Sequence, residues 1–467
     1  MQPSEAARSD PSRPSDLLGA ATGQLLDETQ AHLQRLLRFV TVNPPGNEAP
    51  AIAYLADVLR REGLQAAVLE SAPGRANLIC RIAGRDSEAP LLLASHIDVV
   101  EAERETWTRD PFGGEVFDGC IWGRGAIDMK GKTAMDLAAM IALARLDARP
   151  GRDVTMVVVA DEEAGCHFGS GWLAENHPDL IRAAVCLNEI GGFTMPVMGV
   201  RYYPIQVAEK GMCWLRLTVR GEAGHGSLPR KDSAPIKLAR AIAKLGSTRL
   251  PLHVTPEATR FIEALAAQQS TPIAIALRGL TLPYVGDSIL DYAIRDEGQR
   301  LSIDAILRNT VSPTVIRAGS KTNVIPGVAM VELDGRTVPG QSAEDLIREV
   351  RALVGDEVDI DVIEDQEPVV TSCDTPEYET LVATLKAHDP EGVPVPWLIP
   401  GFTDDKFYAT LGARCYGFTP LRLPPGMSFA SMFHGANERV PVEGYRWGVR
   451  TFLDAVGRLA FGTAPER

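Results

Sequence analysis

Three apolar runs, each followed directly by side chains that can bind metals, limit most strongly how this chain can fold. They occupy residues 91–98, 154–163 and 183–189. Runs that are apolar on both faces are typical of parallel strands covered by helices. In open sheets of that kind, functional groups gather beyond the carboxyl ends of the strands. We therefore expect an α/β fold with a mixed, largely parallel sheet flanked by helices and a functional site at one sheet edge.

The first run delivers a histidine and an aspartate two positions apart. Successive side chains of a strand alternate between faces, so His96 and Asp98 should point the same way at the strand's end. This arrangement suits a metal-binding imidazole whose second ring nitrogen is held by a carboxylate. Further along, Asp128 lies on a glycine-flanked turn, GRGAIDMKG. A second carboxylate at such a turn is what a two-metal site needs as a bridge.

Glu162 and Glu163 are adjacent at the end of the second run. One interpretation is an acidic turn that faces solvent. In the other, one carboxylate binds a metal and its neighbour remains free as a base. Metals lower the pKa of water towards neutrality, and a carboxylate within hydrogen-bond reach can then take its proton.

Two of the eight histidines stand out as candidate ligands. His96 has acidic companions, and His434 lies in a glycine-containing loop, SMFHGANE. Taken alone, His434 is compatible with a structural role, but a two-metal site built from the first half of the chain still lacks one nitrogen ligand. We expect surface or core roles for the histidines that have no acidic companions, namely His32, His177, His253 and His388.

Composition excludes several classes of partner. The formal charge of −14 argues against nucleic acids and anionic membranes, because phosphates bind surfaces that are locally positive. No apolar run reaches the length that spans a membrane. The polar stretch 1–16 lacks the apolar core of a signal peptide, and we interpret it as a disordered lead-in. The seven cysteines are scattered and never spaced as C-x-x-C, which favours a reducing, cytoplasmic location.

Length and pattern predict two domains. Over 208–367 the elements follow the order β-α-β-β-α-β, which is that of a small ferredoxin-like α+β domain. We expect it to be a lid inserted into a catalytic domain made of 17–207 and 368–467. The segment 247–305 shows no clear pattern of helix or strand. Apolar spacing predicts helices near 22–40, 52–63, 132–146, 234–245, 343–354, 378–387 and 445–457.

A series of motifs carries a resemblance to a known family. In order they are SHIDVV, WTRDPFGGEVFDGCIWGRGAIDMKG, ADEEAG, LNEIGG, GHGSLP, TNVIPG, DGRTVPG, GFTDD and HGANE. From about residue 25 to 455 the chain resembles the co-catalytic zinc exopeptidase and amidohydrolase family. That family includes aminoacylase, carboxypeptidase G, carboxypeptidase S, acetylornithine deacetylase and succinyl-diaminopimelate desuccinylase.

The resemblance implies a two-metal site. Asp128 would bridge two zinc ions, with His96 and Glu189 completing one metal site and Glu163 and His434 the other. A set of two histidines with carboxylates also accepts cobalt or manganese.

Further roles follow from the same resemblance. Glu162 would be the general base, and Asp98 would orient the ring of the first histidine. His225 of GHGS would stabilise the oxyanion, often from a partner subunit, which implies a homodimer formed through the lid. Without the family, His225 is a turn histidine between glycines. Asn323 and Arg336 would hold the substrate's carboxylate, which a guanidinium binds with two hydrogen bonds.

These observations lead to three hypotheses. The leading one is a metal-dependent hydrolase that cleaves the amide bond of an N-acyl amino acid or a dipeptide-like substrate with a free carboxylate. The second is a dinuclear-metal phosphoesterase, since paired metals also serve phosphoryl transfer. The third is a non-catalytic dimeric binding protein that retains the fold. The presence of every proposed ligand and the base favours the first.

Overall fold

The chain forms two compact units. The computed structural model describes residues 17, 19, 21–146, 148–295 and 297–462. The expected lead-in at 1–16 therefore lies outside the described residues. The first unit contains the described residues up to Gln206 together with Thr371–Val395 and those from Thr403 onward, and the second contains Val207–Val370 and Pro396–Phe402.

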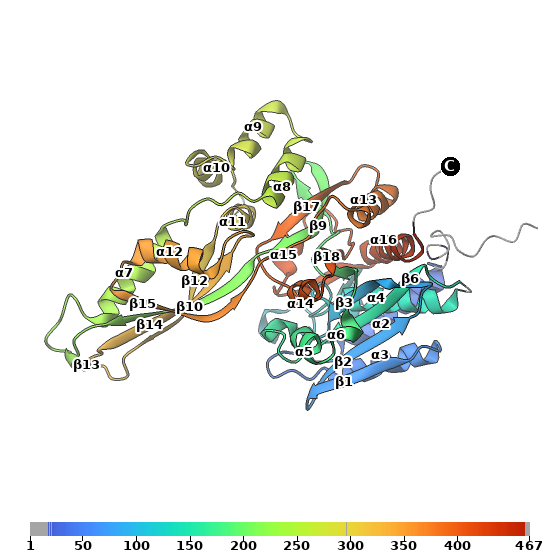
Figure 1. Ribbon diagram of the computed structural model, residues 1–467, viewed down its shortest axis with the longest axis horizontal. Coiled ribbons are helices and arrows are strands. Elements are labelled where there is room, and N and C mark those ends of the chain that lie inside the picture. Colours follow the sequence, from blue (N-terminus) through green and yellow to red (C-terminus); the bar gives the residue numbers. More distant parts are fainter. Residues whose placement is uncertain (1–16, 18, 20, 147, 296, 463–467) are drawn as a thin grey trace, which may run out of the picture. The chain divides into compact units, whose positions relative to one another are not determined.

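A mixed sheet forms the centre of the first unit (Figure 1). Its strands are β1 (Ala66–Ala72), β2 (Arg75–Ile82), β3 (Asp86–His96), β6 (Arg152–Val159), β7 (Val185–Asn188), β8 (Met195–Val197), β9 (Val200–Glu209) and β18 (Arg414–Gly417). The order is β1-β2-β6-β3-β7-β18-β9, with β8 paired to β9; β16 (Val369–Val370) and β17 (Val393–Ile399) also pair with β9. The four central strands β6, β3, β7 and β18 are parallel to one another, whereas the pairs β1–β2, β2–β6, β18–β9 and β8–β9 are antiparallel. The expectation of a mixed, largely parallel sheet is confirmed.

Helices cover both faces of this sheet. One group is α2 (Gly23–Leu37), α3 (Ala49–Arg61), α4 (Lys130–Arg145), α13 (Pro376–His388) and α16 (Val442–Phe461), and the other is α5 (Ser170–Asn176), α6 (Pro178–Ile181) and α14 (Asp405–Thr410). Leu92 and Ala94 of β3 pack in a core with residues of α5, α6 and α14. Ser95, the next residue, points to the opposite face, where α4 packs against β3. Alternate residues of one strand thus serve two layers, as strand geometry requires.

Helix α4 is buried from Lys130 to Leu143, which is unusual for a helix that contains charges. Lys132 donates to the Asp136 carboxylate and also to the carbonyls of Ala94 and Leu187, at 3.0 and 3.1 Å. The ammonium group therefore ties the helix to the sheet. Buried charges are tolerated when they are paired and fully hydrogen-bonded.

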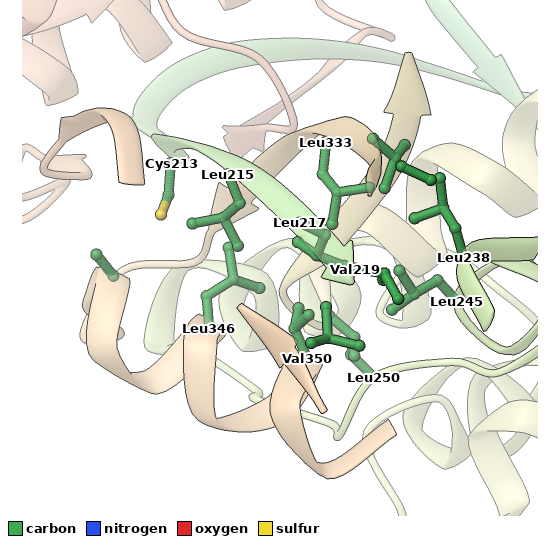
Figure 2. Close-up of a cluster of buried hydrophobic side chains, with 14 of the residues drawn as sticks. Cys213, Leu215, Leu217, Val219, Leu238, Leu245, Leu250, Leu333, Leu346 and Val350 are labelled. Atoms are coloured by element: carbon green, nitrogen blue, oxygen red, sulfur yellow. The ribbon is translucent and has the colours of Figure 1, made fainter. Parts of the chain in front are cut away.

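The second unit has a four-stranded antiparallel sheet in the order β12-β14-β10-β15. Its elements are β10 (Gly211–Arg220), α7 (Ala234–Ser247), β12 (Thr310–Ala318), β14 (Val328–Thr337), α12 (Ala343–Val354) and β15 (Val358–Gln366). This is the ferredoxin-like succession β-α-β-β-α-β. Figure 2 shows its core, where Leu215, Leu217 and Leu333 of the sheet pack with Leu238 of α7 and Leu346 of α12.

The segment without a recognised pattern is helical. Between α7 and β12 the chain forms α8 (Pro256–Ala266), α9 (Thr271–Gly279), α10 (Val285–Tyr292) and α11 (Glu297–Ile306). These helices are short, and α8 and α9 begin with proline in their first turn. A short helix between prolines gives a weak periodic signal over the length on which such patterns are judged.

The remaining elements are small. They are β4 (Glu115–Phe117), β5 (Cys120–Trp122), β11 (Gly224–His225), β13 (Val324–Ile325), β16 (Val369–Val370), β17 (Val393–Ile399), β19 (Arg439–Pro441), α15 (Phe429–Met432) and two 3-10 turns, Arg104–Thr106 and Glu162–Ala164. Strands β19, β5 and β4 form a separate sheet in that order. Across the described residues, no helix combines the length and the apolar character that crossing a membrane requires.

Candidate metal centre

A first group of possible ligands forms around His96 at the end of β3. Its Nε2 atom lies 3.1 Å from Oδ1 of Asp128 and 3.8 Å from Oε2 of Glu189. Glu189 follows directly after β7, which pairs with β3 in parallel. Neighbouring parallel strands thus bring two of these side chains to the same sheet edge. Donor atoms of all three residues lie within 4.8 Å of one another.

A second group shares Asp128 with the first. Nε2 of His434 lies 2.9 Å from Oδ2 of Asp128 and 3.2 Å from Oε2 of Glu163. The two oxygens of Asp128 therefore face different histidines, His96 and His434. The His434 side chain is 46% exposed, whereas His96 is fully buried, so the centre is open to solvent on the His434 side.

The turn after β6 presents both Glu162 and Glu163 to the centre. Asp161 begins the turn in the left-handed region, with a φ of 69°. The backbone N–H groups of Glu162 and Glu163 donate to the two carboxylate oxygens of Asp98, at 3.2 and 3.1 Å. Donor atoms of Glu162, Glu163 and His96 lie within 4.8 Å of one another. One glutamate thus contacts the His434 group while the other remains close to His96.

Asp98 contacts His96 in two ways. The His96 Nδ1 atom lies 3.1 Å from the Asp98 carbonyl oxygen and 3.4 Å from its Oδ1. Since Asp98 also accepts the N–H groups of the glutamate turn, one carboxylate links the ligand on β3 to the turn after β6. The peptide bond after Asp128 is cis.

Behind Asp98 lies a buried polar network that sequence reasoning missed. Asn43 donates to both Asp98 and Asp161 at 2.9 Å. Arg75 donates to Asp161 at 2.8 Å and makes a two-pronged contact with Glu48. All five side chains are buried. The only local signal in the sequence was Asp161, which precedes the two glutamates in ADEE. Its partners Asn43 and Arg75 are far from it in the chain.

The electrostatics of the centre reflect crowded carboxylates. Burial raises the pKa of Glu162 well above its usual range, and Glu189 adds to the rise. Burial raises the pKa of Glu189 to about 8 and, with Asp128 adding to it, that of Glu163 to about 7. Burial alone would lower the pKa of His434, but hydrogen bonds to Asp128 and Glu163 raise it to about 10. The crowded carboxylates thus disfavour one another's negative charge, and a nearby positive charge favours it.

The donor set fits a pair of divalent cations. Four carboxylates of the centre are buried around two imidazoles, an arrangement that costs free energy unless cations compensate it. Oε1 of Glu163 is buried and has no hydrogen-bond partner among the described residues. Histidine nitrogen with carboxylate oxygen is a ligand set that zinc accepts, and cobalt and manganese match it too. The residues present therefore suit a dinuclear site with Asp128 in common.

The other predicted site residues belong to the second unit. His225 on β11 is exposed, and its Nδ1 lies 2.7 Å from Oγ of Ser227. The carbonyl of Asn323 accepts the N–H of Gly226 at 2.9 Å, so Asn323, which directly precedes β13, lies beside the end of β11 that carries His225. Arg336 on β14 donates to both carboxylate oxygens of Asp334 and lies over the ring of Phe402.

One more acidic residue lies close to the centre, in a motif for which the sequence predicted no role. Asp404 of GFTDD is buried and accepts a hydrogen bond from Ser170. Its charge contributes to the raised pKa of both Glu162 and Glu189. The doubled aspartate in the motif was the available signal, but a doubled acid is equally common on exposed turns.

Comparison with known proteins agrees with this architecture. Residues 92–458 match peptidase family M20/M25/M40. The probable carboxypeptidase S-like 2 of Dictyostelium discoideum is 30% identical over 379 residues, covering 77% of this chain and 70% of that protein. The N-fatty-acyl-amino acid synthase/hydrolase PM20D1 of Mus musculus is 31% identical over 392 residues, covering 80% and 75%.

A solved structure shares the fold. The M20 family metallo-carboxypeptidase Sso-CP2 from Sulfolobus solfataricus aligns with a TM-score of 0.70 at 19% identity, over 92% of this chain and 99% of its own. Fold and relatives together define a metal-dependent peptidase or amidohydrolase. The chain belongs to peptidase family M20/M25/M40, and the resemblance drawn from its motifs is confirmed.

Proposed function

We propose that this enzyme hydrolyses the amide bond of an N-acyl amino acid, or of a dipeptide-like substrate with a free carboxylate. The observation that carries the proposal is the meeting of two ligand groups at Asp128, with Glu162 beside them. The names of two relatives support the substrate class, since one is a carboxypeptidase S-like protein and the other an N-fatty-acyl-amino acid synthase/hydrolase.

We assign the two cation sites by contact. His96 and Glu189 would hold one zinc ion, Glu163 and His434 the other, and Asp128 would serve both. Such a pair supplies Lewis acidity, which polarises a carbonyl and makes water more acidic at neutral pH. Cobalt and manganese are the alternatives, and elemental analysis of the purified protein identifies the metal.

Glu162 is the proposed general base. Hydrolysis adds water across the C–N bond, so one proton must leave the attacking water and one must reach the departing amine nitrogen. A carboxylate within hydrogen-bond reach of the reacting atoms can do both. Glu162 is placed for this role because it lies close to His96 and Glu163, and its neighbour Glu163 is engaged by His434.

The test replaces Glu162 by glutamine and by alanine in the full chain. We expect turnover of an N-acyl amino acid panel to fall by about 10²–10⁴-fold with both metal equivalents retained, because a general base commonly contributes that factor. Glu175→Gln, an exposed glutamate on α5, is the matched control. Near-wild-type turnover of the Glu162 variants with full metal content would refute the assignment.

Residues of the second unit are proposed to complete the site. The exposed His225 ring supports a role in stabilising the oxyanion that forms on a substrate in the active site of a partner subunit. This role requires a homodimer formed through this unit. Oxyanion donors commonly lower a barrier by about 3–4 kcal/mol, so an active enzyme that sediments only as a monomer would contradict this role.

Asn323 and Arg336 are proposed to hold the substrate's carboxylate. Nη1 of Arg336 is buried and has no hydrogen-bond partner among the described residues. This nitrogen is therefore available to donate to the substrate's carboxylate. An unchanged KM for acyl amino acids in Arg336→Met would argue against it.

A cytoplasmic location is also proposed. The seven cysteines are scattered along the chain and never spaced as C-x-x-C, which suits a reducing compartment. A disulfide detected in the protein isolated from its cells would oppose it.

A further inference from the structure

Glu438 is a buried carboxylate directly behind the loop that carries Asp128. Its Oε1 accepts the backbone N–H groups of Ile127 and Asp128 at 2.7 and 3.0 Å, and its Oε2 accepts that of Gly125 at 3.0 Å. The side chain has no exposed surface. One carboxylate therefore fixes the backbone of three residues in the turn that presents Asp128.

Arg124 connects this carboxylate to the loop of His434. Its Nη1 donates to Glu438 Oε2 at 2.8 Å, and its Nη2 donates to the His434 carbonyl at 3.2 Å. Arg124 is 3% exposed. The pair, which we call the Arg124–Glu438 clamp, thus contacts the backbone of two proposed ligands at once.

Strand pairing explains why the clamp forms. Strand β19 pairs with β5 antiparallel, and the N–H of Gly123 donates to the Glu438 carbonyl at 3.1 Å. This pairing brings residues that are far apart in the chain to one place, just before β19 and just after β5. His434 and Asn437 have φ values of 55° and 62°, so their loop adopts a backbone that most residues avoid and needs fixed contacts to persist.

We propose that the Arg124–Glu438 clamp positions Asp128 and His434 for a shared cation and so governs how tightly that cation is retained. The inference rests on the proposed dinuclear function and adds positioning residues to it. His96 contacts a different support, the carbonyl and carboxylate of Asp98 with its Asn43 partner, so the clamp acts chiefly on the cation held by Asp128, Glu163 and His434. Groups that orient metal ligands in this way commonly contribute 10–100-fold to metal affinity.

The experiment measures zinc retention by the full chain. Zinc-loaded wild type, Glu438→Gln and Arg124→Lys are titrated with a zinc-binding dye, which resolves the two equivalents without any assay of activity. Glutamine keeps the shape of Glu438 but puts an N–H₂ group where an acceptor is needed. Lysine keeps the charge of Arg124 but has a single nitrogen in place of the two, Nη1 and Nη2, that contact Glu438 and the His434 carbonyl. Arg124→Lys is the milder variant and reports on the clamp if Glu438→Gln fails to fold.

Asp389→Asn is the matched control, because Asp389 is also a buried acid that binds an arginine. Nε and Nη2 of Arg201 donate to its two oxygens at 2.6 and 2.7 Å. Among the described residues, no hydrogen bond or ion pair joins this pair to the proposed ligands. If the clamp only stabilises the fold, Asp389→Asn should lose zinc as readily as the clamp variants do when its free energy of unfolding is lowered by a similar amount.

We expect both clamp variants to release one zinc equivalent 10–100-fold more readily than wild type. The affinity for the other equivalent should change less, and Asp389→Asn should retain zinc as wild type does. His434→Ala should weaken the same equivalent, and combining it with Glu438→Gln should add little, because both act on one cation. Equal weakening of both equivalents, or retention like that of wild type, would overturn the clamp's role. Wild type that binds fewer than two equivalents would instead remove the proposed dinuclear function, and the clamp's role with it.

Discussion

Asp389 shows how a single buried carboxylate can control stability in this protein. It accepts two hydrogen bonds from Arg201 and one from the Tyr203 hydroxyl at 2.7 Å. Burial on its own raises the pKa of Asp389, but these hydrogen bonds outweigh burial and leave it below its usual value. The charged form is therefore favoured in the folded protein more than in the unfolded chain.

Asp389→Asn should destabilise the first unit by about 2 kcal/mol at pH 7. Removing one partner of a buried pair costs about 3–5 kcal/mol, and partial exposure of Arg201 reduces this. Because the folded pKa is depressed, the stabilisation is present above the unfolded pKa and is lost as pH falls through the folded pKa. Urea unfolding between pH 2 and 7 measures both effects. Equal acid sensitivity in wild type and variant would contradict the prediction.

Residues of the centre differed in how far sequence could predict them. His96 and Glu189 stand at the ends of apolar runs, and strand geometry alone brings such residues to one edge. Asn43, Arg75 and Glu438 have no such signal, because their side chains are common on surfaces and only tertiary packing gives them partners. The residues at the strand ends followed from local pattern, whereas these three, which only tertiary packing brings to the centre, did not.

At the scale of elements, the inserted helices show what a pattern search overlooks. The buried residues of α8 are Ala258, Phe261, Ile262, Leu265 and Ala266, which is helical spacing. Its start is marked as well, since Thr255 caps the helix and proline follows it. The signals were present in the chain but spread over only a few turns. The longer α4 and α16 were expected from the same kind of pattern and were found.

Removing the cap of α8 should loosen the insert. Oγ1 of Thr255 accepts the N–H of Ala258 at 3.1 Å, and the side chain is buried. We expect Thr255→Ala to lower local stability by about 1 kcal/mol, the usual contribution of such a cap. Thr255→Ser keeps the oxygen and is the control. Hydrogen exchange of α8 amides measures the effect, and protection equal in both variants would show that the cap contributes nothing.

At the scale of the whole molecule, the two units have separate apolar cores. The second unit buries its own cluster between sheet and helices, while every proposed metal ligand belongs to the first unit. A ligand that binds only the native state of one unit stabilises that unit by an amount set by its concentration and affinity. Metal binding should therefore act on the two units unequally.

Zinc should slow hydrogen exchange in β7 and leave β14 nearly unchanged. At a free concentration about 100 times the dissociation constant, binding stabilises the native first unit by about 2.7 kcal/mol, which is a roughly 100-fold change in the population of its open form. The measurement compares exchange of the full chain in mild denaturant with zinc and with a chelator. His434→Ala is the control and should shrink the difference, because it removes one ligand. An equal response of β7 and β14 would mean that both units unfold in one cooperative step, so that metal bound in the first unit also stabilises the second.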